Sequence, residues 1–437
     1  MSSRILIAWP LAVSGYLPIQ CDGTSWPPDE SGGAAGNSSE TGGTASETGG
    51  TANETGGSAT GGTSTGGNDG DPEDPANEPI LGCDAGVRPE QGTSETLPWQ
   101  RLYWPEFVTG VSANGEVVLG YTTVWDLVTD DYLHRPVVSD GSDWQTVVPE
   151  AASTKAVINC DGTVVAGGYD RLHGFIKRAG QAPVILIGKG NWATEPSGIS
   201  ADGTRVVGNL AYHGDTWNGF GMDPVVWTDL GVASYLWPKE PRMALHITFD
   251  GGLIAGLTDH CNYPAAAANC GVQEHLFTST GRPNETLYPG APAKLMSSDG
   301  STFADTRLVP QPNGLPPLSF ARIFRPSSGL TEVACPPDDP CEVVDISSRG
   351  NILLLNARRP LLWTKRHGLR LLRHVLVEDG VNLPFHRFSV TAMSDDGRVI
   401  VGHGYPLNPV NLEDAPLPDG PRPWSAFRVT LSRNAYE

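Results

Sequence analysis

The residues best suited to chemistry in this sequence are five aspartates, each placed directly before a glycine. They are Asp161, Asp202, Asp250, Asp299 and Asp396. Carboxylates in a repeated pattern could bind a metal ion or act as general acids and bases. Each aspartate stands on a separate copy of one repeated phrase, however, and Asp before Gly also stabilises tight turns. We therefore expect each carboxylate to hold its own turn, and we predict no metal site.

A second candidate chemistry is stacking by aromatic side chains. Trp192 lies in the loop that opens one repeat, and an insertion at residues 211–222 holds Tyr212, His213 and Trp217 among glycines. Loops on a rigid scaffold often carry recognition, and exposed rings could stack on sugar rings or on a partner chain. These four residues are the candidate ligand-binding residues. The alternative is that the rings pack between repeats.

Sequence motifs for catalysis are absent. The ten histidines form no His-x-x-x-His pair, and the sequence has no Gly-x-Ser-x-Gly elbow and no phosphate-binding loop. We therefore predict a non-enzymatic protein without catalytic residues, metal or cofactor. Carboxylates that converge in the interior stay open as an alternative, because a sequence does not show convergence. The formal net charge of −20 argues against a nucleic-acid partner, which needs a basic face.

The repeated phrase occurs seven times, as in Ile199-Ser200-Ala201-Asp202-Gly203. Its seven glycines are Gly115, Gly162, Gly203, Gly251, Gly300, Gly350 and Gly397. Asp-Gly or Asn-Gly between apolar runs is a strong hairpin signal, because tight hairpin turns need positive φ angles. An apolar strand follows each turn, and two more strand-like runs complete each repeat. Four short strands in each of seven repeats predict an all-β protein, a seven-bladed β-propeller.

Two further patterns refine this prediction. In five repeats a glycine stands five residues after the turn glycine, which indicates close approach of another backbone segment or a bend. Those glycines are Gly120, Gly167, Gly208, Gly256 and Gly402. The last repeat ends after three strands, whereas residues 97–103 precede the first repeat as an unpaired strand. We expect this N-terminal strand to complete the last blade and close the ring, with the propeller spanning residues 96–437.

The repeats resemble those of a bacterial extracellular family, the HAF-repeat proteins. The resemblance rests on the pattern Ser-x-Asp-Gly-x-x-Val-Val-Gly followed by Ala-Phe-x-Trp-Thr. Residues 199–208 with Val226-Trp227-Thr228 are the closest copy, and residues 393–402 with Ala426-Phe427 are the next. The resemblance covers about 340 residues and implies export and a propeller-like fold. It implies no reaction.

The N-terminus has the pattern of an export signal. Arg4 is followed by an apolar run and then by Cys21, which resembles a bacterial lipoprotein signal with Cys21 as the lipidated residue. The residues just before Cys21 depart from that pattern: Gln20 replaces a small residue and Pro18 replaces leucine. We expect a signal peptide over residues 1–20 and a protein anchored by lipid to the outer membrane or cell surface. Ordinary secretion or a periplasmic location is the alternative.

Residues 21–95 are expected to form a disordered tether. They hold 14 acidic residues and one basic residue, and a Ser/Thr/Gly-rich phrase repeats between residues 31 and 67. Such a segment cannot bury enough apolar surface to offset the entropy of ordering it.

Six cysteines remain besides Cys21. An even number in an exported chain predicts disulfides. Cys261 with Cys270 and Cys335 with Cys341 bracket short loops and are plausible local pairs. Cys83 with Cys160 is then the remaining pair. No Cys-x-x-Cys motif indicates zinc.

The sequence therefore predicts an exported, surface-tethered, monomeric propeller that binds an envelope polysaccharide or a surface protein. It touches a membrane only through its lipid anchor. An exported propeller hydrolase or lyase that acts on glycans is the alternative.

Overall fold

The computed structural model of this chain describes most of the repeat region and a short segment before it. The described residues are 78–84, 89–97, 107–126, 131–151, 155–170, 172–188, 192–212, 222–228, 231–236, 242–259, 272–278, 294–312, 315–406 and 425–436. All of them belong to one compact unit, residues 69–262 with 270–437. The expected signal peptide, Cys21 and residues 21–77 of the expected tether lie outside the described residues.

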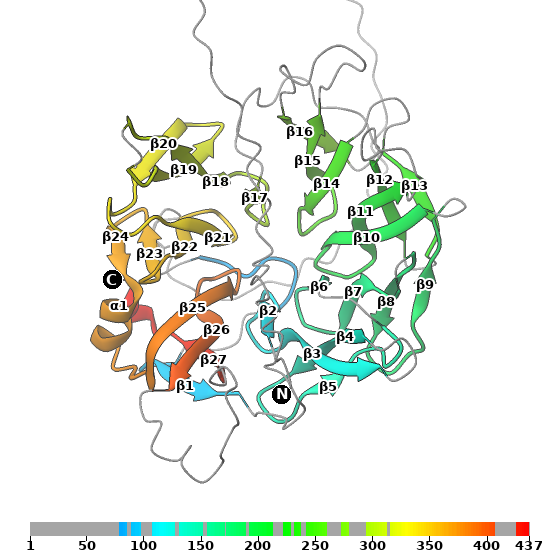
Figure 1. The fold of residues 1–437 in the computed structure, drawn as a ribbon, viewed down its shortest axis with the longest axis horizontal. Coiled ribbons are helices and arrows are strands. Elements are labelled where there is room, and N and C mark those ends of the chain that lie inside the picture. The colour runs from blue at the N-terminus through cyan, green and yellow to red at the C-terminus, as the bar shows by residue number, and fades with distance from the viewer. Residues whose placement is uncertain are drawn as a thin grey trace, which may run out of the picture. The chain divides into compact units, whose positions relative to one another are not determined.

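The described strands form seven antiparallel sheets, one for each repeat (Figure 1). Sheet one is β2 (Phe107–Val111), β3 (Val118–Asp126), β4 (Asp131–Ser139) and β5 (Gln145–Thr146). Sheet two is β6 (Ala156–Ile158), β7 (Val164–Gly168), β8 (Gly174–Arg178) and β9 (Val184–Leu186). Sheet three is β10 (Trp192–Ile199), β11 (Arg205–Tyr212), β12 (Met222–Thr228) and β13 (Ala233–Tyr235). Sheet four has three described strands, β14 (Arg242–Ile247), β15 (Leu253–Asp259) and β16 (Val272–Thr278).

The C-terminal half continues the pattern. Sheet five is β17 (Leu295–Met296), β18 (Phe303–Val309), β19 (Leu318–Arg325) and β20 (Gly329–Ala334). Sheet six is β21 (Glu342–Ile346), β22 (Ile352–Asn356), β23 (Leu361–Thr364) and β24 (Gly368–Leu371). Sheet seven is β25 (Phe385–Met393), β26 (Val399–Pro406) and β27 (Ser425–Thr430), joined by β1 (Thr93–Thr96). The all-β prediction is thus confirmed, with α1 (Leu372–Glu378) and the 3₁₀ turn η5 (Arg433–Ala435) as short additions.

Each repeated phrase folds as the tight turn between the first and second strands of its sheet. In sheet three the Ser200 hydroxyl donates to Asp202 at 2.7 Å, and the Thr204 amide donates to the same carboxylate oxygen at 2.9 Å. Gly203 has the positive φ of +67° that such turns favour. Asp161, Asp250, Asp299 and Asp396 accept equivalent bonds. The prediction that each aspartate holds its own turn is confirmed.

Four of the five glycines that stand five residues after the turns, Gly120, Gly167, Gly208 and Gly402, allow close backbone approach, as predicted. A Cβ atom built on Gly402 would lie 2.0 Å from the Ser389 carbonyl oxygen, and one on Gly208 would lie 2.2 Å from the Glu195 carbonyl oxygen. The pairing register of the first strand shifts beside each of these sites. A β-bulge therefore brings the first strand against the second where only glycine fits.

Buried side chains join each sheet to the next. Seven apolar clusters each contain residues of two sheets that follow one another, and one of these clusters joins sheet seven to sheet one. Representative members are Leu119 with Val165, Ala166 with Val206, Val207 with Ile254, Ala255 with Phe303, Ala321 with Leu353, Leu354 with Ile400, and Val399 with Val118. Fully burying one such side chain contributes about 1.5–3 kcal/mol, so these layers are the main source of stability.

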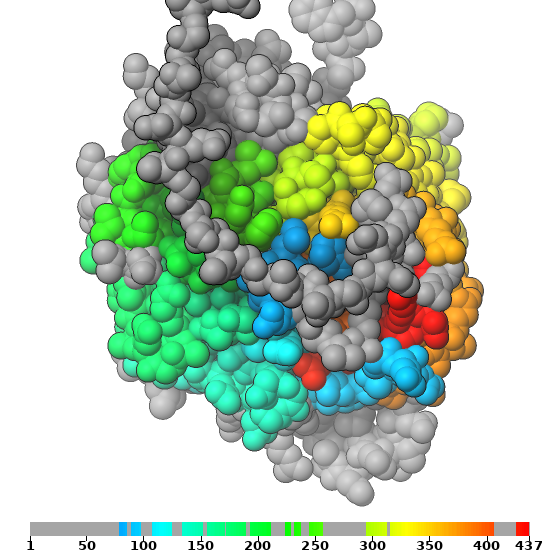
Figure 2. Space-filling view, turned by 180° about the vertical axis from the view of Figure 1, so that it is seen from behind, coloured from blue at the N-terminus to red at the C-terminus, as the bar shows by residue number. Residues whose placement is uncertain are grey.

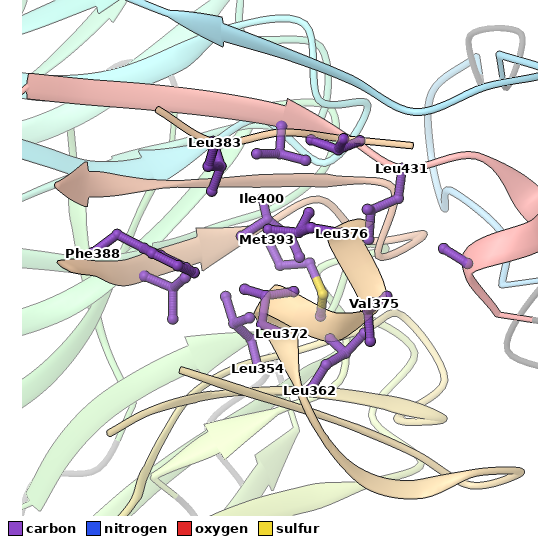
Figure 3. Packing of buried hydrophobic residues seen from close by; sticks show 14 of the residues in the cluster. Leu354, Leu362, Leu372, Val375, Leu376, Leu383, Phe388, Met393, Ile400 and Leu431 are labelled. Carbon is purple, nitrogen blue, oxygen red and sulfur yellow. The ribbon is translucent and has the colours of Figure 1, made fainter. Parts of the chain in front are cut away.

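The largest layer lies between sheets six and seven. Leu354 and Leu362 of sheet six lie with Met393 and Ile400 of sheet seven beside α1 (Figure 3). The helix buries its apolar residues at positions 372, 375 and 376, the spacing of a single helix face. Among the described residues, no helix combines the length and apolar character needed to cross a bilayer.

Backbone hydrogen bonds also connect the seven turns in series. Each bond runs from an amide of one turn to a carbonyl of the next, and the last runs from the Asp395 amide to the Ala113 carbonyl of the first turn. The other six are Asn114 to Cys160, Cys160 to Ala201, Ala201 to Phe249, Phe249 to Ser298, Asp299 to Ser348, and Ser348 to Asp395. The third residue of each phrase, which varies between repeats, therefore contributes its backbone to this series.

Two expected boundaries need correction. The N-terminal strand that joins sheet seven is Thr93–Thr96, paired with residues 427–430 of β27, and not residues 97–103. Leu97 follows it as a buried residue whose amide donates to the Ala426 carbonyl. The folded region also begins before residue 96, because residues 78–84 make buried contacts described below. The β-branched threonines favour a strand here, and the composition of the tether hid both features.

Candidate functional site

The sheets have two chemically different ends. We call the end that carries the seven turns the turn end, and the opposite end, where the second and third strands are connected, the far end. Trp192 is the first residue of β10 and Tyr212 is the last residue of β11, and the two are paired directly in the register. The structure therefore brings these two candidates together at the far end. His213 and Trp217 lie outside the described residues, between β11 and β12.

At the turn end lies the segment Glu78–Asp84, which we call the strap. Glu78 is only 5 % exposed. Its carboxylate accepts hydrogen bonds from the Ser347 and Ser348 hydroxyls at 3.0 and 2.9 Å. It also accepts from the backbone amides of Arg349 and Asn351 at 3.1 and 2.9 Å. One side chain of the strap thus satisfies four donors in the turn of sheet six.

The strap continues from sheet six to sheets two, three and four. Gly82 has a φ of +82°, and a Cβ atom placed on it would lie 2.4 Å from the Ala201 side chain and 3.3 Å from the ring of Phe249. Cys83 forms a disulfide with Cys160. Figure 2 shows blue atoms of this part of the chain among green and yellow segments that are distant in sequence. The strap therefore ties together turns that lie far apart in the chain.

The disulfides agree with two of the three predicted pairs. Cys83–Cys160 and Cys335–Cys341 are both formed, with Cα atoms 5.9 and 5.8 Å apart, the usual separation for such a bond. Cys261 and Cys270 lie outside the described residues, so their pairing stays a prediction. Structural disulfides are typical of oxidising compartments, which is consistent with export.

Carboxylates gather at the turn end beside the strap. Asp345 accepts from the Met393 amide of sheet seven at 2.7 Å and from its own neighbour Ile346 at 2.8 Å. Asp395 accepts from the Ser298 hydroxyl of sheet five at 2.8 Å. These acidic side chains therefore link sheets through hydrogen bonds. Within the described part of the chain, no three His, Cys, Asp or Glu side chains come together as a metal site would need.

The electrostatics of this group are unusual. Burial raises the pKa of Asp345 to about 6. Burial, together with the charges of Asp345, Asp396 and Glu78, raises the pKa of Asp395 to about 7. Burial also raises the pKa of Glu78. Carboxyl groups with such values can hold or release a proton near neutral pH. Asp345, Asp396 and Glu78 therefore lie near enough to Asp395 for their charges to act on it.

A group of rings lies at the far end, where sheet one meets sheet seven. Phe107 stacks on Tyr121 with ring centroids 5.2 Å apart and an interplanar angle of 25°. His403 of β26 meets Phe107 edge-on at 5.7 Å, and His134 meets Tyr121 edge-on at 5.1 Å. Nδ1 of His134 lies 3.0 Å from the Thr123 hydroxyl. All four rings are half-buried.

Sequence reasoning missed both the strap and this ring group. Phe107, Tyr121, His134 and His403 belong to four different strands, so no local spacing connects them. Their distance from the turn glycines was the only available signal: Tyr121 and His403 each stand six residues after one. For Glu78, no feature of the sequence distinguished it from the other acidic residues of the tether.

Comparison with known proteins gives structural neighbours but no family. No protein family and no characterised protein matches the sequence. Among solved structures, the chain is similar to oligogalacturonate lyase from Vibrio parahaemolyticus, with 9% identity, a TM-score of 0.47 and coverage of 78% of this chain and 98% of that one. It is also similar to the β-propeller domain of the Trilobed protease from Pyrococcus furiosus, with 10% identity, a TM-score of 0.45 and coverage of 68% and 91%.

A third structure, hydrazine synthase from Kuenenia stuttgartiensis, has 14% identity and a TM-score of 0.42 and is matched over 70% of this chain and 94% of that one. The chain is thus an all-β protein of antiparallel, mostly four-stranded sheets with β-propellers among its structural neighbours. A fold of this kind does not by itself indicate an activity.

Proposed function

We propose that this chain is an exported, surface-tethered β-propeller that binds an envelope polysaccharide or surface protein without chemical turnover. Its seven sheets would be the blades of a ring closed by β1. The seven apolar layers and the series of turn-to-turn hydrogen bonds support a closed ring, because each includes a link between sheets seven and one. The HAF-repeat resemblance supports the same architecture. Lipidation of Cys21 would hold the protein at the surface, and secretion or a periplasmic location is the alternative.

The observation that carries the binding proposal is the direct pairing of Trp192 with Tyr212 at the far end. The strap and the turn hydrogen bonds occupy the opposite end. The far end is therefore where the connections between strands are free to vary, and these connections include the stretch that carries His213 and Trp217. Aromatic residues in such a position can stack on the apolar faces of sugars.

The test is retention of the purified full chain on whole cells, cell-wall material and exopolysaccharide, with the supernatant assayed for released sugar. We expect retention without sugar release, and a clear loss of retention in Trp192→Ala and Tyr212→Ala. Tyr235→Ala is the matched control, since Tyr235 is an exposed tyrosine on the outermost strand of the same sheet. Protease treatment of the cell-wall material separates a polysaccharide target from a protein target. Equal retention of all three variants would contradict the assigned site, and no retention of the unaltered chain would contradict the function.

A glycan hydrolase or lyase is the second candidate, and the carboxylate group of Asp345, Asp395 and Glu78 favours it. It predicts sugar release that Asp395→Asn abolishes. Release that survives this substitution would exclude that group as the catalytic one.

A further inference from the structure

An arginine and a threonine face the layer between sheets seven and one near the far end. Thr122 of β3 and Arg135 of β4 are direct partners in the register. Side chains alternate along a strand, so they share the face of Val118 and Val137. Those two valines pack with Val399 and other residues of sheet seven. Thr122 and Arg135 therefore point toward sheet seven, farther from the turns than the valines.

Among the described residues, neither side chain has a hydrogen-bond partner. Thr122 is only 5 % exposed, and its hydroxyl oxygen is buried without a bond. Nε of Arg135 is likewise buried without an acceptor, and among the described residues its guanidinium has no ion pair. Leaving a buried donor unsatisfied costs about 1–3 kcal/mol, and more for a charged group. No acidic side chain in the described part of the chain pairs with this half-buried arginine, so its guanidinium is available to an acceptor on a ligand.

Sheet seven contributes a polar group to the same layer. His403 shares the face of Val399 and Val401 on β26, and both valines belong to the layer with sheet one. Burial lowers the pKa of His403 to about 4, so its imidazole is neutral at physiological pH. A neutral imidazole can accept or donate a hydrogen bond without repelling the Arg135 charge. Its ring touches Phe107, so the stacked pair of Phe107 and Tyr121 borders this polar group.

These groups together have the chemistry of a site for an acidic sugar. A guanidinium binds a carboxylate most strongly, through two parallel hydrogen bonds. A threonine hydroxyl and a neutral imidazole match sugar hydroxyls, and half-buried aromatic rings can pack against the apolar face of a sugar ring.

We infer that the far end of the layer between sheets seven and one binds a carboxylate-bearing sugar residue of a polysaccharide, with Arg135 as the partner of the carboxylate and Thr122 and His403 as partners of its hydroxyls. This inference rests on the proposed polysaccharide binding and specifies its ligand class and a second site. It differs from the Trp192 site, which lies on sheet three.

The test is equilibrium binding of the purified full chain to three soluble polymers: alginate, the same alginate with its carboxyl groups reduced to alcohols, and dextran sulfate. We expect tightest binding to alginate and at least tenfold weaker binding to the reduced polymer. Arg135→Gln should weaken alginate binding at least tenfold. Arg366→Gln, which removes an exposed charge from the hairpin of sheet six, should leave it unchanged. Equal affinity for reduced and native alginate would overturn the inference, as would stronger binding to dextran sulfate.

The variant Thr122→Val distinguishes a loss of binding from a loss of folding. It removes an unsatisfied buried hydroxyl while keeping the shape, so the melting temperature should stay equal or rise while alginate binding weakens. Unchanged alginate binding in both Thr122→Val and Arg135→Gln would refute the site but leave the proposed function intact. Failure of the unaltered chain to bind any envelope glycan would instead refute the proposed function.

Discussion

Asp395→Asn is expected to stabilise the protein at alkaline pH and to reduce the dependence of its stability on pH. In the folded state the pKa of Asp395 is about 7, because of burial and the nearby charges of Asp345, Asp396 and Glu78, against an ordinary value of 3.8. A carboxyl whose pKa is raised on folding favours the folded state most at a pH below its unfolded pKa. That contribution is lost as pH rises through the folded pKa. The unaltered protein should therefore become more stable as pH falls from 8 toward 5.

The size of the effect follows from the shift. Each pKa unit corresponds to about 1.4 kcal/mol, so the full shift would be about 4 kcal/mol. Asp395 keeps part of its surface accessible although protein encloses it, so solvent screens its charge. The neighbouring carboxylates also share the electrostatic cost of ionisation with Asp395. About 2 kcal/mol is therefore the expected gain of Asp395→Asn at pH 8, falling to about 0.8 kcal/mol at pH 5, because the penalty builds up between pH 3.8 and 7. Asn keeps an oxygen that can accept from the Ser298 hydroxyl.

The assay is unfolding by heat and by urea at pH 5, 6, 7 and 8, with both variants treated identically. A gain of this size corresponds to a rise in melting temperature of about 4 °C. Asp250→Asn is the matched control, because the Thr248 hydroxyl and the Gly252 amide hold the pKa of that exposed turn carboxyl below its usual value. It should lower stability by the same amount from pH 5 to pH 8, because the contribution of a carboxyl whose pKa is lowered on folding is lost only as pH falls below its ordinary value of 3.8. A loss of stability in Asp395→Asn at pH 8, or a gain that does not vary with pH, would refute the electrostatic reasoning.

Two further outcomes are expected from the covalent and steric features of the fold. The Cys83→Ser/Cys160→Ser double variant should lose about 4 kcal/mol of unfolding free energy, against about 2 kcal/mol for Cys335→Ser/Cys341→Ser, because a cross-link across 77 residues restricts the unfolded chain more than one across 6. Urea unfolding of both variants checks the order, and an equal loss would show that the strap adds nothing through its disulfide. Gly402→Ala should destabilise the protein by about 1–3 kcal/mol, because its Cβ would meet the Ser389 carbonyl oxygen. Gly110→Ala, whose Cβ would have ordinary contacts at 3.6 Å, is the control in the same melting experiment, and equal melting temperatures would contradict the close approach.

Much of the local structure could be predicted from the sequence. The Ser200-to-Gly203 turn closes within a few residues, so its hydroxyl, carboxylate and positive-φ glycine are all visible in one short phrase. The bulge opposite Gly208 is visible in the same way, as a glycine at a fixed distance from the turn. The Cys335–Cys341 disulfide spans 6 residues and follows from proximity in the chain.

Contacts between distant parts of the chain follow from the tertiary structure alone. In the sequence Glu78 looks like the other acidic residues of a polar segment. In the structure its carboxylate accepts a hydrogen bond from Ser347, which is 269 residues away. In the sequence Thr122 and Arg135 look like ordinary strand residues. Only the packing of sheet seven against sheet one shows that the Thr122 hydroxyl and the Arg135 Nε are buried without a partner among the described residues. The physical reason is that turn chemistry depends on neighbours a few residues away. Burial and pairing in the layers depend instead on which sheets meet, and only the folded arrangement of all seven determines that.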